Sequence, residues 1–586
     1  MIRSVRFLPQ ARTFHRLVRL LTTKRQQHEA LKNGTLVTTS EPSKLVKTDL
    51  VAHLQWIERN KPSYEKNQEP PLFPDPSGVV NVDLTDAMFD LKDMYDPRIH
   101  LANAPDWDKD GYEATTPLSD DLIALIGATG RTMTVAEYMR QALTHPLYGY
   151  YTCPERKDDW EDLDSVFDEP VTPSNYIIGA KGDFVTAPEI SQIFGESIAV
   201  WFMIQWQTIG KPTDIQIVEI GPGKGTLICD VIKTSMKSFK DHCGASLRMI
   251  HLVETSPAMR EEQRRKLEEL DLDLDATIVF EDQASSKSEN APPNVPKKDS
   301  KQVIRVQWHD SFASVKANAP KMPTFIVCQE LIDALPIHAF EKTIDGWRER
   351  MIDVAAKSDE DDEELQKPQQ AEVKKTADTT TDIKLKEKLP RLRIVIAPDV
   401  TPGVTTLLNV DKDGKIEGDD SSEIGSVIEV CPEGILLVQD IHKFIEHNRG
   451  AALIIDYGEE GSSDSIRGFS KHKQVSFLSR PGEVDVTADV DFTALKHAVN
   501  SRRGAEDSSD NSPFAFGPIE QGKFLVSMGA TERAMHIIDD DKTTDEHAAE
   551  IHDALERLIS PEYMGHRYKV LAIARKKDGI FEPAAF

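Results

Sequence analysis

The residues that most clearly suggest a ligand-binding site are three closely spaced glycines, Gly221, Gly223 and Gly225, in the stretch V-E-I-G-P-G-K-G-T-L. They follow an apolar run, which predicts a buried strand that turns into a helix around a nucleotide-like ligand. A dinucleotide fingerprint needs its third glycine one position later, where this sequence has Thr226. From these residues alone, a plain structural turn and a dinucleotide-binding loop stay open as alternatives.

The acid that precedes the glycines narrows the choice of ligand. Glu219 completes an E-x-G-x-G-x-G pattern, which resembles the first motif of class I S-adenosylmethionine-dependent methyltransferases. In that motif the glycines let the backbone come close to the methionine part and the ribose of the cofactor. The acid balances the ammonium and sulfonium charges of the cofactor. The resemblance implies that Glu219 and the three glycines bind S-adenosylmethionine.

Two more acids follow predicted strands. Glu254 ends the strand R-M-I-H-L-V-E-T, where its carboxylate can accept both ribose hydroxyls of a nucleoside. The same acid would suit NAD, so Glu254 indicates a nucleoside-type ligand without selecting one cofactor. Asp310 follows the strand V-I-R-V-Q-W-H and can accept from an adenine amino group, although a helix cap explains it equally well.

The candidate catalytic residues are Glu330 and Asp333, in T-F-I-V-C-Q-E-L-I-D-A-L-P. Gln329 and Glu330 end a predicted strand, and Asp333 follows three residues later, at the start of a turn or helix. Two such carboxylates can hold the donor fork of a guanidinium and accept the proton that leaves on methylation. The structural alternative is a strand-end acid at Glu330 and a helix cap at Asp333.

A further loop, G-D-F-V-T-A-P-E-I-S at residues 182–191, precedes the predicted sheet. Gly182 permits close backbone approach, and Phe184 could cover the adenine or methionine part of a ligand. Thr186 or Glu189 could cap the following helix without any ligand. We predict no metal site.

The elements that must position these residues alternate between strands and helices. Short apolar strands are predicted at 215–221, 248–255, 303–309, 324–330 and 451–458, with helices between them. This order predicts an α/β fold with a mostly parallel sheet, helices on both faces, an added N-terminal helical region and inserted elements. Residues 523–529 and 568–576 are predicted as the two strands of an antiparallel edge.

Composition excludes several classes of protein. The 586 residues carry a formal net charge of -28, which argues against general nucleic-acid binding. Five scattered cysteines, with no C-x-x-C pair, argue against a disulfide framework or a zinc site. We expect no stable membrane insertion, since no apolar run reaches the ~18 residues that span a bilayer.

The N-terminus differs from the rest of the acidic chain. Seven basic residues and no acid precede residue 29, and regularly spaced arginines would form a basic amphipathic helix, which predicts a mitochondrial transit peptide over about residues 1–40. A poorly ordered leader is expected at 41–115, and the main domain at 116–576. Within it, polar low-complexity segments at 282–300, 357–388 and 503–512 are predicted to be loop insertions, and 577–586 a tail.

Eight blocks, in order, resemble the MidA-like family: H-P-L-Y-G-Y-Y, G-D-F-V-T-A-P-E-I-S-Q-I-F-G-E, V-E-I-G-P-G-K-G-T-L, Q-E-L-I-D-A-L-P, I-I-D-Y-G, D-V-T-A-D-V-D-F, G-P-I-E-Q-G-K-F-L and M-G-H-R-Y-K-V-L-A-I. They cover roughly residues 130–576. The resemblance implies a class I methyltransferase core that binds S-adenosylmethionine. It also implies that Gly182, Asp183 and Phe184 form a loop over the cofactor.

The same resemblance implies a protein-arginine methyltransferase of the mitochondrial matrix. Its expected target is an arginine of the 49 kDa subunit of respiratory complex I, its expected product a symmetric dimethylarginine, and its expected role complex I assembly. Gln329 departs from the asparagine that is common in the family at this position. The alternatives are an assembly scaffold with a methyltransferase fold, which acts mainly by protein binding, and a small-molecule methyltransferase.

Overall fold

The structure, a computed structural model, describes residues 115–152, 185–270, 272, 276–281, 302–355, 390–411, 414–416, 422–470, 473–501, 512–575 and 582–586. The predicted transit peptide, nearly all of the predicted leader and of the three predicted insertions, and the predicted cofactor residues Gly182, Asp183 and Phe184 lie outside these residues.

The centre of the fold is a nine-stranded sheet in the order β16-β17-β11-β6-β2-β3-β5-β4, with β15 paired to β11. Its strands are β2 (Ile215–Ile220), β3 (Leu247–Val253), β4 (Ala276–Glu281), β5 (Gln302–His309), β6 (Thr324–Gln329), β11 (Gly450–Glu459), β15 (Val490–Asp491), β16 (Pro513–Glu520) and β17 (Tyr568–Arg575). Only the pairs β11–β17 and β16–β17 are antiparallel. The predicted mostly parallel sheet is confirmed.

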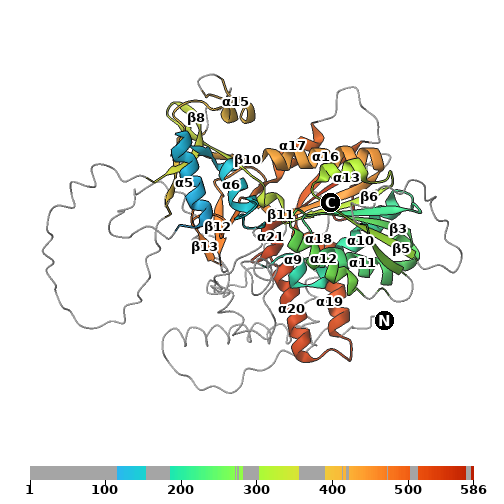
Figure 1. The fold of residues 1–586 in the computed structure, drawn as a ribbon. Helices are drawn as coiled ribbons and strands as arrows, with labels where there is room; N and C mark the ends of the chain where they lie inside the picture. Colours follow the sequence, from blue (N-terminus) through green and yellow to red (C-terminus); the bar gives the residue numbers. More distant parts are fainter. Residues whose placement is uncertain are drawn as a thin grey trace, which may run out of the picture.

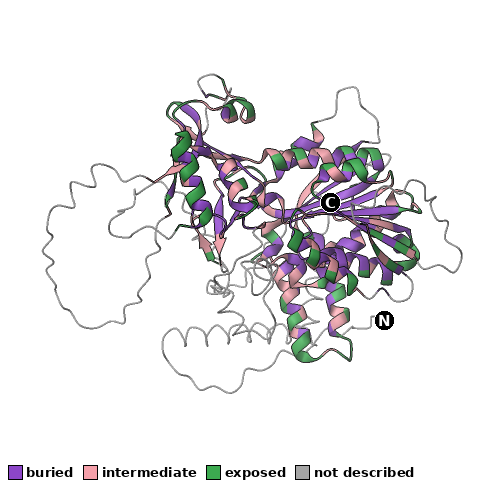
Figure 2. Cartoon of the chain, viewed as in Figure 1, coloured by how far each residue is buried: buried purple, intermediate pink, exposed green. Residues whose placement is uncertain are grey.

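Helices cover both faces of this sheet, as predicted (Figure 1). One face packs on α10 (Gln192–Thr208), α11 (Thr226–Lys237), α12 (Pro257–Glu268), α18 (Gln521–Ser527), α19 (Ala530–Ile538) and α20 (Asp545–Ile559). The other packs on α13 (Phe312–Asn318), α16 (Pro432–Asn448) and α17 (Phe492–Asn500). Short turns α9 (Ala187–Ile190), η1 (Lys240–Gly244) and α21 (Met564–Arg567) complete this part. Figure 2 shows the strands as a buried layer between the helices, as expected for a parallel sheet.

A smaller β-rich part carries the predicted N-terminal helices, α5 (Pro117–Thr129) and α6 (Val135–Thr144). A five-stranded sheet joins β1 (Met133–Thr134), β7 (His338–Thr343), β8 (Gly346–Val354), β9 (Leu392–Ile396) and β10 (Val427–Val430), next to α15 (Pro402–Leu407). A three-stranded sheet joins β12 (Arg467–Ser470), β13 (Lys473–Val475) and β14 (Asp485–Thr487). A capping box starts α6, because Thr134 Oγ1 accepts from Glu137 N at 3.0 Å and Glu137 Oε2 accepts from Thr134 N at 2.8 Å. In the part of the chain that the structure describes, no helix is long and apolar enough to cross a bilayer.

One predicted strand is wrong. Residues 523–529 were expected to pair at the sheet edge, but most of them belong to helix α18, and the edge strand is β16 instead. The buried residues Phe524, Leu525 and Met528 repeat with helical spacing, and Gly529 ends the segment with a φ of 87°. The apolar run was too short to distinguish a buried helix from a strand. Strand β17 is confirmed.

A buried chain of polar side chains crosses the sheet beneath α13. Ser314 Oγ lies 3.1 Å from His309 Nδ1, His309 Nε2 lies 2.9 Å from His251 Nδ1, and His251 Nε2 lies 3.1 Å from Gln216 Oε1. Gln216 Nε2 donates to Thr324 Oγ1 at 2.9 Å, so its Oε1 must accept from His251. One set of neutral tautomers then satisfies the whole chain. Burial lowers the pKa of His251 to about 3 and that of His309 to about 4.

We expect these histidines to make the free energy of unfolding fall in mild acid. Their pKa is lower in the folded than in the unfolded state, so their contribution is complete above about pH 6.5 and is lost as the pH falls towards about 4. In chemical denaturation at about pH 7.5 and about pH 5.5, H309Q should therefore lose roughly 1 kcal/mol less than the wild type. H547Q, which replaces a histidine with 58% of its side chain exposed, is the control and should follow the wild type. Equal pH dependence in H309Q and wild type would contradict this assignment.

Candidate active site

The predicted site residues of the described chain lie at one edge of the sheet, where the parallel strands end. The glycine loop follows β2, Glu254 follows β3, Asp310 follows β5, and Gln329 ends β6 with Glu330 directly after it. The carboxyl edge of a parallel sheet is where open α/β folds bind their ligands. Strand β11 ends at the same edge, next to β6, and adds Asp456 and Tyr457.

The glycine loop adopts backbone conformations that favour glycine. Gly221, Gly223 and Gly225 have φ values of 72°, 48° and 79°, all in the left-handed region. A Cβ atom at Gly221 would lie 3.0 Å from Leu331 Cδ1, so a side chain there would press on the turn that carries Asp333. Helix α11 begins directly after Gly225, at Thr226. The loop thus presents a helix N-terminus and close backbone, which suits an anionic or polar ligand.

Glu219 lies inside the sheet next to this helix N-terminus. Its side chain is buried, and it accepts a hydrogen bond from the backbone of Ile228, in the first turn of α11. No described residue bonds its Oε2 atom. Burial raises the pKa of Glu219 to about 8. Since Gly225 has no side chain to cap the helix, Glu219 supplies an acceptor from the neighbouring strand.

Gln263 of α12 connects the glycine loop with Glu254. Its amide nitrogen donates to Gly223 O at 2.7 Å and to Glu254 Oε2 at 3.2 Å, and its oxygen accepts from Trp308 Nε1 at 2.8 Å. Glu254 Oε1 accepts from Ser256 N at 2.8 Å, and burial raises the pKa of Glu254. The sequence analysis missed Gln263, because a single polar residue within a charged helix carries no motif signal.

Asp310 lies at the exposed rim of this edge of the sheet. Its side chain is 73% exposed and forms an ion pair with Arg260, whose Nε also donates to Glu254 O at 2.8 Å. The structural alternative of a helix cap is wrong, because Ser311 caps α13 by accepting from Ser314 N. Arg260 thereby places Asp310 beside Glu254 at the rim.

The segment before the sheet also differs from expectation. Thr186 occupies the N-cap position of α9 but makes no side-chain cap bond, and Ser191 caps α10 instead. Glu189 bonds the hydroxyl of Thr226, at the start of α11, and lies 3.6 Å from Lys266 Nζ. The predicted capping role of Thr186 and Glu189 is therefore wrong. Glu189 ties this segment to the glycine loop.

Glu330 adopts a strained backbone conformation at the end of β6. Its φ is 48°, which is uncommon for a residue with a side chain and occurs preferentially at functional sites. Its Oε1 accepts from Ala187 N at 3.0 Å and from the Gln329 amide, and its own N–H donates to Ile455 O at 2.9 Å. Burial, and then the charge of Asp333, raises the pKa of Glu330 to about 8.

Asp333 lies in the short turn η3 (Ile332–Ala334), with 7% of its surface exposed. Tyr457 O–H donates to Asp333 Oδ2 at 2.7 Å, whereas no described residue bonds the buried Oδ1. Burial raises the pKa of Asp333 to about 6. The alternative of a helix cap is wrong, because Asp333 is inside the turn and Leu331 precedes it as the N-cap residue.

Asp456, which the sequence analysis did not select, holds this turn in place. Its Oδ2 accepts from the backbone N–H groups of Leu331, Ile332 and Asp333 at 3.2, 2.9 and 3.3 Å. The carboxylate is buried, and burial raises its pKa well above the ordinary value. A polar residue at the end of an otherwise apolar strand, in I-I-D-Y-G, is the signal that could have identified Asp456.

Three tyrosines that we did not predict bond carboxylates here. Tyr457 bonds Asp333, Tyr568 at the start of β17 bonds Glu330, and Tyr151 O–H donates to Asp485 Oδ1 at 2.8 Å. The rings of Tyr457 and Tyr568 meet edge to face, with centroids 5.6 Å apart. Burial raises the pKa of each phenol well above its ordinary value, so all three stay neutral donors.

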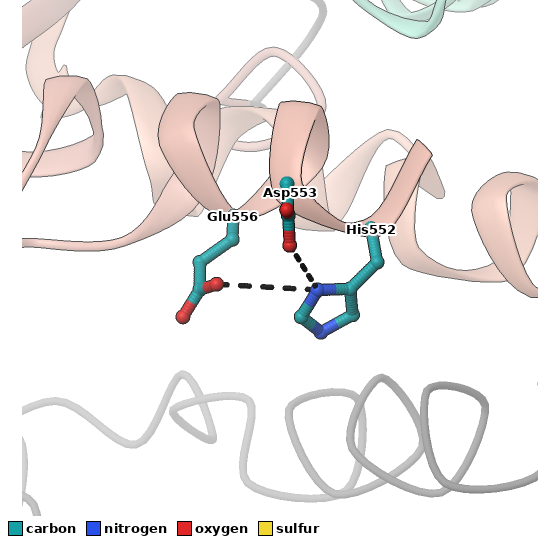
Figure 3. A group of neighbouring side chains, drawn as sticks. All are labelled: His552, Asp553 and Glu556. Carbon is teal, nitrogen blue, oxygen red and sulfur yellow. Dashed lines mark hydrogen bonds and ion pairs between the residues drawn. The ribbon is translucent and has the colours of Figure 1, made fainter. Parts of the chain in front are cut away.

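One group of side chains on α20 has the donor types that bind metals (Figure 3). His552 Nδ1 lies 3.3 Å from Asp553 Oδ1 and 3.9 Å from Glu556 Oε2. All three residues come from one helix, and no predicted site residue belongs to the group. Helical spacing places His552 and Glu556 on one face of α20, and Asp553 is the next residue along the chain, so their proximity needs no ion.

Comparisons with known proteins agree on one family. Residues 197–508 match the profile of a family described as "Putative S-adenosyl-L-methionine-dependent methyltransferase". The human "Protein arginine methyltransferase NDUFAF7, mitochondrial" is 32% identical over 461 residues, which cover 78% of this chain and 83% of that protein. The Drosophila melanogaster "Protein arginine methyltransferase NDUFAF7 homolog, mitochondrial" is 30% identical over 459 residues, covering 78% and 84%.

A solved structure has a similar fold. A Burkholderia thailandensis protein, crystallised with S-adenosyl-homocysteine, aligns with a TM-score of 0.53 and 20% identity over 80% of this chain and 97% of that chain. The strand order described above, with one antiparallel strand between β11 and β16, is that of a class I methyltransferase core, as the sequence predicted.

We expect Gln263 to hold the glycine loop. Replacing it with leucine removes donors to Gly223 and Glu254 and leaves the Trp308 indole N–H without its acceptor, which should lower the free energy of unfolding by about 1–3 kcal/mol. Hydrogen exchange at residues 221–225 should become faster in Q263L. The control is Q207L, at an exposed glutamine of α10. Wild-type exchange rates in the loop of Q263L would contradict a positioning role.

Proposed function

The chain belongs to this family of S-adenosylmethionine-dependent methyltransferases, and from that premise we propose that it methylates arginine side chains of a protein substrate. Relatives named protein arginine methyltransferases support this substrate class, because this chain covers 83% of the human protein at 32% identity. S-adenosylmethionine is the methyl donor of the proposed reaction.

The single observation that carries the substrate class is the pair Glu330 and Asp333. The charge of Asp333 raises the pKa of Glu330, and Asp333 Oδ1 is a buried acceptor to which no described residue donates. Such an arrangement is costly unless a cation with several N–H donors completes it. A guanidinium, with a rigid fork of five donors, meets both carboxylates better than a compact ammonium.

The residues of the glycine loop fit the cofactor. Gly221, Gly223 and Gly225 allow a ligand to approach the backbone closely. Glu219 offers a carboxylate oxygen that no described residue bonds, and Glu254 has a carboxylate at the strand tip for ribose hydroxyls. We assign further contacts with the cofactor to Asp310 and Gln329. Gly182, Asp183 and Phe184 would form the loop that covers the cofactor. When bound, the cofactor supplies an electrophilic methyl group on a sulfonium sulfur.

The chain's own residues then orient the substrate and move its proton. Glu330 and Asp333 hold one side of the guanidinium, which leaves its other nitrogen free to face the methyl group. Tyr457 and Tyr568 keep the carboxylates oriented by donating to them. A carboxylate with a pKa near neutrality can accept the proton that leaves the methylated nitrogen.

The finer assignments are part of the same proposal. The target is an arginine of the complex I 49 kDa subunit, the product is symmetric dimethylarginine, and the reaction serves complex I assembly in the mitochondrial matrix. Support comes from the names of the relatives, which include the word mitochondrial, and from the basic amphipathic N-terminus. Mass spectrometry of that subunit in cells lacking this chain tests the target, since persistent methylation there would contradict it.

We expect E330Q and D333N to lose arginine methylation and keep the cofactor. Each substitution removes a charge that holds the guanidinium, so kcat/KM for an arginine peptide should fall by about 10²–10⁴-fold. Cofactor affinity, measured by calorimetry, should stay within a few-fold of wild type. D539N, at an exposed acid directly after α19, is the matched control. Full activity in both E330Q and D333N would reject the assigned roles.

We expect G223V to abolish cofactor binding, because valine tolerates a φ near 48° poorly and its branches would occupy the space beside the loop. Calorimetry with S-adenosylmethionine measures this directly. In cells, loss of binding together with loss of complex I assembly supports catalysis. Normal complex I assembly with a G223V chain that binds no cofactor would instead favour the scaffold.

The proposed location is tested separately by cell fractionation. Recovery of the chain outside the matrix fraction would contradict it.

A further inference from the structure

Arg467, at the start of β12, is a resident guanidinium next to the proposed substrate site. Its Cζ lies 5.0 Å from the ring centroid of Tyr457, the residue that donates to Asp333. Only 6% of Arg467 is exposed, and its Nη1 donates to Ser465 O at 2.7 Å. A cation stacked on an aromatic ring in a buried place fixes the ring.

Asp489 anchors this arginine. Arg467 Nη2 donates to Asp489 Oδ1 at 2.6 Å, and Asp489 N–H donates to Ser465 Oγ at 2.8 Å. A second arginine, Arg567, donates to both oxygens of Asp489 at 2.8 and 2.6 Å. Two arginines therefore share one acid, so part of the positive charge of Arg467 is left to act on its other neighbours.

Those neighbours are negative or neutral. The charged groups near Asp333, besides Arg467, include the carboxylates of Glu330 and Asp456, and Asp485 acts with Asp333 on Tyr151. The remaining titratable groups there stay neutral, because burial raises the pKa of each above its ordinary value: Tyr151, Tyr457, Tyr568, Cys328 and Cys431. The charge of Arg467 lowers the pKa of Asp333 against the effect of burial.

We propose that Arg467 is a positioning residue that holds Tyr457 against Asp333 and keeps Asp333 negatively charged for the substrate. This inference rests on the proposed function. Without Arg467, Asp333 would face two other carboxylates in a buried place and would take up a proton near neutral pH. A protonated Asp333 offers its free oxygen to a guanidinium only as a weak, uncharged acceptor. Arg467 itself touches neither substrate nor cofactor in this role.

The test compares pH profiles of arginine-peptide methylation. Activity should rise with pH as the pair Glu330 and Asp333 ionises. Removing the cation favours the protonated form of this pair, so R467Q should move the acid limb of kcat/KM to higher pH by about 1 unit or more. R467K keeps the charge but not the planar stack, so it should keep the acid limb and show a several-fold lower kcat/KM. The matched comparison is R567Q, which removes the other arginine of Asp489 and leaves this acid to Arg467 alone. It should move the acid limb less than R467Q does.

The outcomes separate this inference from the proposed function. Cofactor affinity measured by calorimetry should be the same in all three variants, which also shows that they are folded. An active wild type together with an unshifted R467Q, or an equal shift in R567Q, would overturn the inference alone. If R467Q does not fold, a wild-type kcat/KM in R467K would still overturn the positioning role. A folded wild type that binds the cofactor but methylates no arginine would overturn the proposed function, and this inference with it.

Discussion

The constraint on which this site depends is the gathering of three carboxylates in a buried place at the end of two neighbouring strands. Glu330, Asp333 and Asp456 repel one another and are poorly solvated, so burial and mutual repulsion favour their protonated forms. The chain offsets this cost with backbone N–H groups that donate to Asp456, phenols that donate to Glu330 and Asp333, and one buried cation, Arg467. No described residue donates a hydrogen bond to the buried Asp333 Oδ1. The ligand of this site must therefore supply an N–H or O–H donor.

The cofactor side of the site is built differently. Its ligand groups are mainly backbone atoms and single acids, and they are held by neighbours that need not touch a ligand. Gln263 joins the glycine loop to Glu254, and Glu189 joins the preceding segment to the first residue of α11. The two sides meet where Leu331 packs against Gly221, so the turn that carries Asp333 rests on the glycine loop. A second link runs through α9, where Ala187 N donates to Glu330 and Glu189 bonds Thr226.

The β-rich part supplies residues to the site, although they lie more than a hundred positions after Asp333 in the sequence. Its strand β12 begins with Arg467, Asp485 of β14 accepts from Tyr151, and Ala488 N donates to Asp333 O at 2.9 Å. These contacts hold the turn from the side opposite the sheet. The parallel sheet supplies the strand ends that carry the carboxylates. The β-rich part surrounds these carboxylates with aromatic and charged groups, which determine whether each carboxylate is protonated.

The sequence by itself determined the parallel core, the glycine loop and the acids that follow β3, β5 and β6, because each of these signals is local. Apolar runs identify buried strands, and glycines or an acid directly after such a strand predict a polar site at that edge of the sheet. Only the tertiary structure decided that residues 523–529 form a helix, that Ser311 rather than Asp310 caps α13, and that Asp456, Tyr457 and Arg467 surround Asp333. The physical reason is that these outcomes depend on which groups lie opposite one another after strands more than a hundred residues apart have paired. Spacing along the chain carries no record of that pairing.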